Sequence, residues 1–403
     1  MNLFVKNYLK SFLLLSINAR ILLFFYMIQS ISAGAAFFIA IFLDVHLHLS
    51  AETIGIIVSI FIVGNLSGSW LITLMLDKLS PFKISAFSSL LQGLSFIILS
   101  LNDSIFIIGL AMYLLGVSGY SYVVSAEYLI IKTAGDTDEH RSRAISFINV
   151  ASNIGVGLGG CFVSFLSEDH PKLLLSFIGL LLIFLSIYYL SKHKRIDYIK
   201  EKALYKDSDA TTQAGQSIYY YLSLFVILVL GLIFAQQRVS YSIYLAQNFG
   251  ASEISSLLLL NSLLIILFLP GINSITEKYN GFFMMGLGGL MLGGGMSLYQ
   301  FTSSYLIVIL ICIVITIGEM LSTLLTQLIC FQFAKSGKQG KAMGYYKLLY
   351  SLGTVIGTST GGAIQTHLGI NMIWSFCGLL GIVIFSCSLI GVFKHQKLSY
   401  SLG

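Results

Sequence analysis

The sequence predicts an all-α integral membrane protein, with twelve transmembrane helices in two six-helix halves. Hydrophobic residues make up 56% of the 403 residues and charged residues 10%, whereas a soluble domain carries about 25% charged residues. The apolar residues gather in twelve stretches, each near the ~20 residues that a helix needs to cross a bilayer core. Because lipid offers the backbone no hydrogen-bond partners, these stretches must be helices.

The spans follow one another with few residues between them, so consecutive helices are expected to be antiparallel neighbours. We place them at 21–43, 53–76, 83–101, 104–131, 144–167, 172–191, 218–246, 254–276, 281–301, 305–333, 341–366 and 370–393. A charged linker at 192–217 separates an N-terminal half, 1–191, from a C-terminal half, 218–403. An even number of spans puts both termini on one side.

Basic residues predict which side that is. Apart from Arg238 and Lys347 within spans, Lys172 at the start of span six alone falls on the face opposite the termini, and the 192–217 linker is rich in Lys and Arg. Cytoplasmic loops carry an excess of Lys and Arg, so we expect a multi-pass protein of the inner (cell) membrane with both termini in the cytoplasm. The net charge of +6 then reflects orientation in the membrane, and no nucleic-acid partner is expected.

The two halves share an internal repeat. Span five begins RAISFINVASNIGVGLGG and span eleven begins KAMGYYKLLYSLGTVIGT. In this register Gly155 aligns with Gly353 and Gly159 with Gly357, so each helix has a G-x-x-x-G at the same depth. Small residues four apart let two helices approach closely in lipid, and we predict helix packing at all four glycines. A G-x-x-x-G also occurs without any repeat, but the shared register favours duplication.

The loop after span two, TLMLDKLSPFKI, resembles the signature G-x-x-x-D-[RK]-x-G-[RK]-[RK] of the major facilitator superfamily. Asp77 and Lys78 match its acidic-basic core and Lys83 a trailing base, while Thr73 and Ser80 replace the two glycines. The resemblance covers essentially the whole chain and implies the major facilitator fold. It also implies a gating latch between the halves at Asp77 and Lys78.

Further motifs bear on the direction of transport. Arg141 and Arg143, before span five, are expected partners for the gating loop. Spans five and eleven are similar to the family's antiporter signature G-x-x-x-G-P-x-x-G-G, although Gly160 and Thr358 replace its proline. The Gly318–Met320 run is similar to one in the drug–proton antiporter branch, which implies efflux.

Three ionisable residues stand out deep inside spans, where a charge is retained when it faces a cavity or a partner. Glu319 is near the middle of span ten, and we predict that it couples transport to protons. Arg238 and Lys347 lie in spans seven and eleven. Polar stripes at helical spacing, on spans that line the cavity in the family, add the other residues. The predicted substrate-binding set is Tyr26, Gln29, Tyr120, Glu127, Asn149, Gln237, Arg238, Tyr241, Thr323, Gln327 and Lys347.

Several of these residues have a simpler interpretation. Glu127 lies near the end of its span and could meet lipid headgroups, and Lys347 could snorkel to the interface. Asn149 could bond only between helices. Glu319 is too deep in its span to snorkel and can neutralise one of the two cations, which would leave a net positive cavity.

The sequence thus predicts a secondary transporter and not an enzyme. The favoured function is proton-coupled efflux, by alternating access, of a drug-like compound, a metabolite or a siderophore. Uptake of an organic anion, favoured by Arg238 and Lys347, and a non-transporting sensor or scaffold are the alternatives. The GGLMLGGG run at 288–295 lacks the Lys-Ser/Thr of a phosphate loop, and we expect no cofactor, no metal and a monomer whose partners are cargo, protons and lipid.

Overall fold

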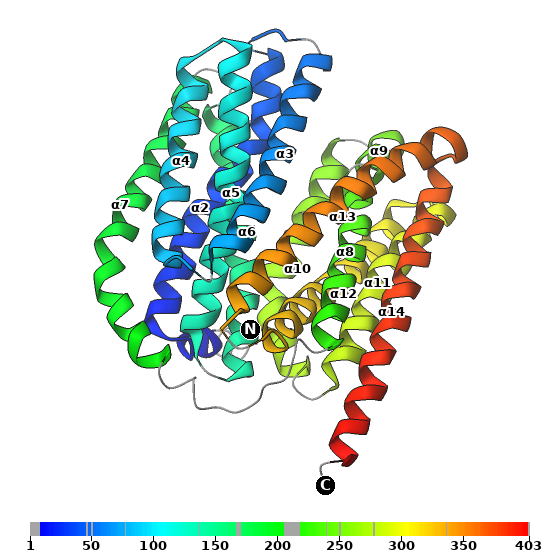
Figure 1. The fold of residues 1–403 in the computed structure, drawn as a ribbon. Helices are drawn as coiled ribbons and strands as arrows, with labels where there is room; N and C mark the ends of the chain where they lie inside the picture. Colours follow the sequence, from blue (N-terminus) through cyan, green and yellow to red (C-terminus); the bar gives the residue numbers. More distant parts are fainter. Residues whose placement is uncertain are drawn as a thin grey trace.

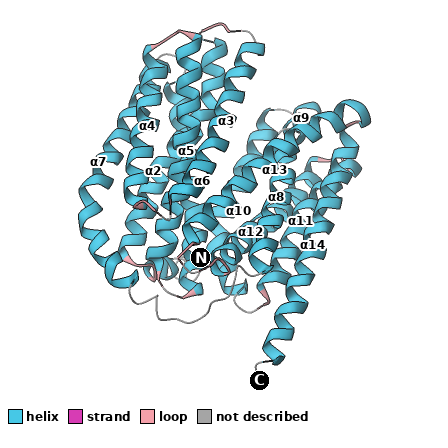
Figure 2. Cartoon of the chain, in the orientation of Figure 1, coloured by secondary structure: helices cyan, strands magenta, loops and turns pink. Residues whose placement is uncertain are grey.

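The computed structural model describes residues 9–401 apart from 46, 50, 77, 136, 167–170, 205–217, 239, 250, 277–278 and 336. Helices make up nearly all of this part of the chain, and no strand occurs in it (Figure 2). The predicted all-helical fold is confirmed.

The helices form two groups (Figure 1). The first group, coloured blue to green, consists of α2 (Ile17–Val45), α3 (Ala51–Met75), α4 (Pro81–Leu101), α5 (Ile105–Ala134), α6 (Asp138–Leu166) and α7 (Pro171–Leu204). The second group, coloured green to red, consists of α8 (Ile218–Arg238), α9 (Ser240–Asn248), α10 (Ala251–Thr276), α11 (Gly281–Ser297), the short 3-10 helix η2 (Leu298–Phe301), α12 (Tyr305–Gln332), α13 (Gln339–Leu368) and α14 (Ile370–Ser401).

Most boundaries lie within a few residues of the predicted spans, and three segments differ more. Helix α7 continues to Leu204, into the predicted linker. The stretch after residue 191 has no Gly or Pro and is rich in Lys and Glu, which are good helix formers. The helix therefore extends past the apolar stretch. Helix α14 likewise continues to Ser401, beyond the predicted end of span twelve at residue 393. Span seven, predicted over 218–246, corresponds to α8 and α9, which lie on either side of residue 239, outside the described residues.

Nine helices in the described part of the chain are long and apolar enough to cross a membrane. The predicted spans that fall short correspond to α6, α10 and α13, although α10 holds a shorter apolar stretch at Leu259–Leu269. Helices α6 and α13 begin with charged and polar residues. All three pack against helices of the opposite group, so part of their surface faces protein and can be polar without meeting lipid.

Helix ends are set by local chemistry in the short turns. The side-chain oxygen of Asn280 accepts hydrogen bonds from the backbone N–H of Phe282 and Phe283, at 2.9 and 3.2 Å, and so caps α11. Pro81 occupies the start of α4, where its missing N–H has no helical partner to lose. These turns let consecutive helices run antiparallel.

Both halves use one pairing plan. In the first half α2 packs on α6, α3 on α5 and α4 on α7. In the second half the corresponding pairs are α8 on α13, α10 on α12 and α11 on α14. The internal repeat seen in the sequence is therefore matched by a repeat in packing.

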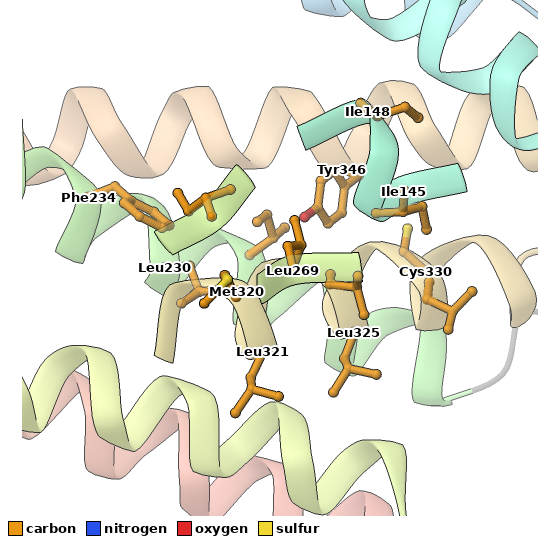
Figure 3. Close-up of a cluster of buried hydrophobic side chains, with 14 of the residues drawn as sticks. Ile145, Ile148, Leu230, Phe234, Leu269, Met320, Leu321, Leu325, Cys330 and Tyr346 are labelled. Atoms are coloured by element: carbon orange, nitrogen blue, oxygen red, sulfur yellow. The ribbon is translucent and has the colours of Figure 1, made fainter. Parts of the chain in front are cut away.

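The halves meet mainly through α3 against α13 and α6 against α10 and α12. One large buried cluster contains residues of both halves. In Figure 3, Ile145 and Ile148 of α6 belong to the same cluster as Leu269 of α10 and Tyr346 of α13. A second cluster, which includes Phe42 of α2, is confined to the first half. In Figure 1 the two groups converge near the chain termini and diverge toward the opposite end.

Candidate transport site

A buried carboxylate lies where the halves meet. Glu127, in the last third of α5, is 2% exposed. Lys347 Nζ of α13 donates to Glu127 Oε1 at 2.8 Å, and Gln327 Nε2 of α12 donates to Oε2 at 2.8 Å. The Tyr26 hydroxyl of α2 donates to Oε1 at 3.0 Å. The carboxylate is therefore bonded both within its own half and across to the other half.

This pairing disfavours the simpler interpretations of Glu127 and Lys347. The buried Glu127 is an ion-pair partner and is not left to meet headgroups, and the Lys347 side chain is 19% exposed and bonded across the halves. The Lys347 ammonium also lies 5.9 Å from the centroid of the Tyr346 ring. The partner of Lys347 is Glu127 and not Glu319, so Lys347 supplies no free positive charge here.

Glu319 forms a separate polar centre in the second half. It lies eight residues before Gln327 on α12, or about 12 Å along the axis at ~1.5 Å per residue, toward the end where the halves diverge. Asn261 Nδ2 of α10 is 3.3 Å from Glu319 Oε2 and 2.9 Å from Thr316 Oγ1. The Thr323 hydroxyl donates to the backbone carbonyl of Glu319 at 2.7 Å. The two carboxylates thus lie at different depths of the protein.

The other predicted residues of the first half differ in their surroundings. Gln29 is buried, its amide nitrogen donates to Gln92 Oε1 of α4, and its oxygen accepts from Ser89 Oγ at 3.1 Å. It belongs to a network inside the half. Asn149 donates to the Ile145 carbonyl of its own helix at 3.0 Å. Tyr120 of α5 is partly exposed.

In the second half the remaining candidates lie at the end of α8 and the start of α9. Gln237 is partly exposed, and Arg238 is the last residue of α8, its side chain lying outside the described part. Tyr241 is buried and stacks on Tyr299 of η2, with ring centroids 4.9 Å apart. Tyr241 is therefore part of an aromatic cluster.

The predicted gating loop is described in part. Asp77 lies outside the described residues, and Lys78 is exposed. Arg141 pairs with Asp138 at 3.2 Å, and Arg143 pairs with Glu139, all on the first turns of α6. The Arg141 guanidinium also lies 5.4 Å from the ring centroid of Phe331 on α12, so this end of α6 contacts the other half.

Close backbone approaches occur at three of the predicted glycines, Gly155, Gly353 and Gly357, and at one other. A Cβ on Gly155 would overlap α2 at Met27 and Ser30, and one on Gly353 would lie 3.1 Å from Gly231 Cα of α8. A Cβ on Gly344 would lie 2.7 Å from Thr73 Cα. Helix α13 therefore touches α3 of the other half without room for a side chain.

Sequence reasoning missed three buried or partly buried amides. Gln92 lies in span three, from which we selected no site residue, and Asn261 lies in the apolar stretch of α10. Gln236 precedes Gln237 but is 1% exposed. A lone amide in an apolar span signals an interhelical hydrogen bond, and that signal was present for Gln92 and Asn261. Gln236 could not be distinguished from the adjacent Gln237.

A cavity of about 660 Å³ opens between the halves near the start of α6. Its walls come from both halves: Asp138, Glu139, Arg141 and Ser142 on one side, and Tyr279, Asn280, Gly281, Phe282, Leu325, Leu328, Ile329, Gln332 and Phe333 on the other. Among the described residues, no group of three or more His, Cys, Asp or Glu side chains could hold a metal ion.

Two six-helix halves joined by a buried ion pair define a membrane carrier with a central path. The chain belongs to the Major Facilitator Superfamily, whose sequence profile matches residues 22–358 and 222–399. It is a multi-pass membrane transporter for a small-molecule substrate and not an enzyme.

Known relatives agree with this family. Multidrug resistance protein 2 of Bacillus subtilis (strain 168) is 24% identical over 368 residues, or 87% of this chain and 88% of that one. The uncharacterized MFS-type transporter YttB of the same strain is 26% identical, covering 82% of this chain and 83% of that one. The crystal structure of the human organic anion transporter MFSD10 (TETRAN) has the same fold, with a TM-score of 0.75 at 12% identity, covering 92% of this chain and 98% of that one.

Proposed function

We propose that this transporter exports a small organic compound in exchange for protons. The observation that carries the proposal is the Glu127 carboxylate, which is buried and bonded to Gln327 and Lys347 of the other half. Alternating access requires the halves to separate at one end and then at the other. Glu127 must lose both of those partners when its end opens.

Proton binding is the natural compensation for that loss. Removing one partner of a buried ion pair leaves an uncompensated charge and costs about 3–5 kcal/mol. A protonated carboxyl carries no charge and needs no counter-ion, so protonation of Glu127 lowers the energy of the separated arrangement. Opening and proton binding are coupled in this way. Glu319, which lies nearer the end where the halves diverge, remains a second candidate for proton coupling. A proton and cargo can compete for its carboxylate.

The proposed direction of transport follows from the orientation of the protein in the membrane. We propose that both termini and the linker are cytoplasmic, from the basic residues of the loops. The end that Glu127 closes is then the cytoplasmic one. A proton from outside would release Glu127, and cargo would bind after the cytoplasmic end opens. The low-identity match to a protein named for multidrug resistance supports export.

The orientation has its own test. A single cysteine at position 200, in a variant without native cysteines, should react with an impermeant thiol reagent only after the cells are opened. Labelling of intact cells would reverse the orientation and, with it, the direction of transport.

Uptake of an organic anion is the alternative. It was favoured by two cavity cations, Arg238 and Lys347, and the pairing of Lys347 with Glu127 weakens that argument. The description of MFSD10 as an organic anion transporter does not strengthen the uptake alternative, because a likeness at 12% identity supports the fold alone.

Flux in liposomes under an imposed pH gradient tests the proposal. Labelled candidates should include neutral, cationic and anionic compounds and a siderophore. Glu127→Gln and Glu319→Gln are compared with Asp103→Asn, which changes an exposed carboxylate away from the cavity between the halves. We expect gradient-driven flux to fall at least tenfold in Glu127→Gln, while gradient-free exchange persists. Unchanged gradient-driven flux in both Glu127→Gln and Glu319→Gln would refute proton coupling at these sites, and gradient-driven accumulation of an anion would favour uptake.

A further inference from the structure

Arg20 carries a charge at the edge of a membrane span. It is the fourth residue of α2, whose apolar span runs from Ile17 to Gly34. At ~1.5 Å per residue it lies about 4.5 Å from the start of the helix, near the boundary between the hydrocarbon core of a bilayer and the headgroups. A guanidinium is not deprotonated in proteins, so the charge is permanent.

The Arg20 guanidinium has no acceptor in the part of the chain that the structure describes. The side chain is partly exposed, but its Nε is buried and makes no hydrogen bond. The carboxylates whose ion pairs are described belong to Asp103, Glu127, Asp138 and Glu139, and each of them pairs with another basic residue. A buried N–H without an acceptor is costly, so an acceptor from outside the chain would stabilise this residue.

The helix face beside Arg20 is apolar and open. Ile17, Ile21 and Phe24 are 65%, 40% and 55% exposed. Their spacing of three and four residues puts them on one face of α2, and Arg20 is three residues from Ile17 and four from Phe24. In a membrane span such a face contacts lipid. The acceptor nearest to hand is therefore one that a lipid carries.

The charge of this region favours an anionic lipid. The first 43 residues contain no Asp or Glu, and Lys10, in the helical stretch 9–13, is exposed. The planar fork of a guanidinium matches two oxygens of a phosphate. Zwitterionic lipids carry the same phosphate, but a region of net positive charge attracts the lipid with net negative charge more strongly.

We propose that Arg20 binds the phosphate of an anionic phospholipid, whose acyl chains lie along Ile17, Ile21 and Phe24. Lys10 adds positive charge at the same end of the molecule. The site involves neither cargo nor protons, so it goes beyond the proposed function and does not depend on it.

The test measures which lipid lies beside α2 in the full-length protein. A fluorophore is attached through Ile17→Cys in a variant without native cysteines. The protein is placed in vesicles of phosphatidylcholine with a minority of phosphatidylglycerol, and bromine on the acyl chains of one lipid or the other quenches the fluorophore. The ratio of the two quenching strengths, corrected for the lipid composition, gives the local preference for phosphatidylglycerol.

The preference should fall about fivefold in Arg20→Gln, the scale of one basic residue near an anionic surface. Arg20→Lys keeps the charge and loses the planar fork, so the preference should fall only about twofold. The matched control is Lys335→Gln, which removes an exposed lysine in the turn after α12, at the same end of the bundle. It should leave the preference unchanged. If Arg20→Gln does not fold, Arg20→Lys carries the comparison.

Three results would overturn the proposal. An unchanged preference in Arg20→Gln would show that the guanidinium does not bind the lipid. An equal loss in Lys335→Gln would assign the preference to the overall charge of this end of the protein. Inorganic phosphate should have no more effect than sodium chloride of the same ionic strength, and specific loss of the preference in phosphate would mean that Arg20 binds a free anion.

Discussion

The two halves pair their helices alike but place their polar groups differently. In the first half, Gln29 and Gln92 bond to each other inside the bundle. In the second half, Asn261 of α10 donates to the Glu319 carboxylate of α12, and Gln236 of α8 donates to the Gly357 carbonyl of α13. The comparison teaches that one backbone plan can hold a half whose buried amides bond to each other and a half whose amides bond to a carboxylate and to the backbone.

Glu127 differs from the polar residues of either half, because its hydrogen-bond partners come from both halves. Substitutions that act between the halves should therefore behave differently from those that act within one half. The following changes test that distinction, from the largest expected effect to the smallest.

Removal of the Lys347 ammonium should have the largest effect. Lys347→Ala leaves the buried Glu127 carboxylate without its counter-ion, which costs about 3–5 kcal/mol. Thermal or denaturant unfolding in detergent measures the loss. The double variant Glu127→Gln with Lys347→Ala removes both charges and should recover most of it. A single variant as stable as the unmodified protein would show that the pair does not link the halves.

A methyl group between the halves should change the balance of conformations. A Cβ on Gly344 would lie 2.7 Å from Thr73 Cα of the other half, and overpacking of this kind costs about 1–3 kcal/mol. Gly344→Ala should therefore disfavour the arrangement in which this end is closed. Labelling of a cysteine at Leu328, which lines the cavity between the halves, should become about tenfold faster.

The matched control acts inside one half. A Cβ on Gly353 would lie 3.1 Å from Gly231 Cα, and both residues belong to the second half. Gly353→Ala should lower stability without faster labelling at Leu328. Equal labelling in the two variants would mean that Gly344 has no special role between the halves.

At the end away from the termini, loss of one hydroxyl should have a smaller effect. Tyr244→Phe removes the hydrogen bond to the Thr302 carbonyl and keeps the ring contacts, so we expect a loss of about 0.5–1.5 kcal/mol. Hydrogen exchange should become faster in α9 and stay unchanged in α2. Faster exchange in both helices would show that the effect is not confined to the second half.

The corresponding end of the first half carries an exposed ion pair instead. Lys172 Nζ lies 2.9 Å from Asp103 Oδ1, with side chains 50% and 60% exposed. Such pairs contribute about 0.2–1 kcal/mol, so Asp103→Asn should change stability least. The small effect should also shrink at high salt, and a loss comparable to that of Lys347→Ala would contradict this ranking.

The fold was predictable because each membrane span can be recognised from its own length and hydropathy, without knowledge of its neighbours. The same local logic indicated Glu319, Lys347 and Gln327 as polar residues in apolar helices. It could not pair Lys347 with Glu127, because the two lie on different halves and their meeting depends on how the halves dock. Gln236 and Gln237 are identical in type and adjacent, and only the tertiary structure distinguishes the buried one from the partly exposed one.

The buried cluster that spans both halves has a thermal consequence. Ile145 and Ile148 share that cluster with Leu269 and Tyr346 (Figure 3), so separating the halves at this end brings apolar surface into contact with water. Exposure of apolar surface raises the heat capacity by about 0.45 cal/mol/K for each Å². The equilibrium between the two arrangements should therefore vary with temperature along a curve and not a straight van 't Hoff line.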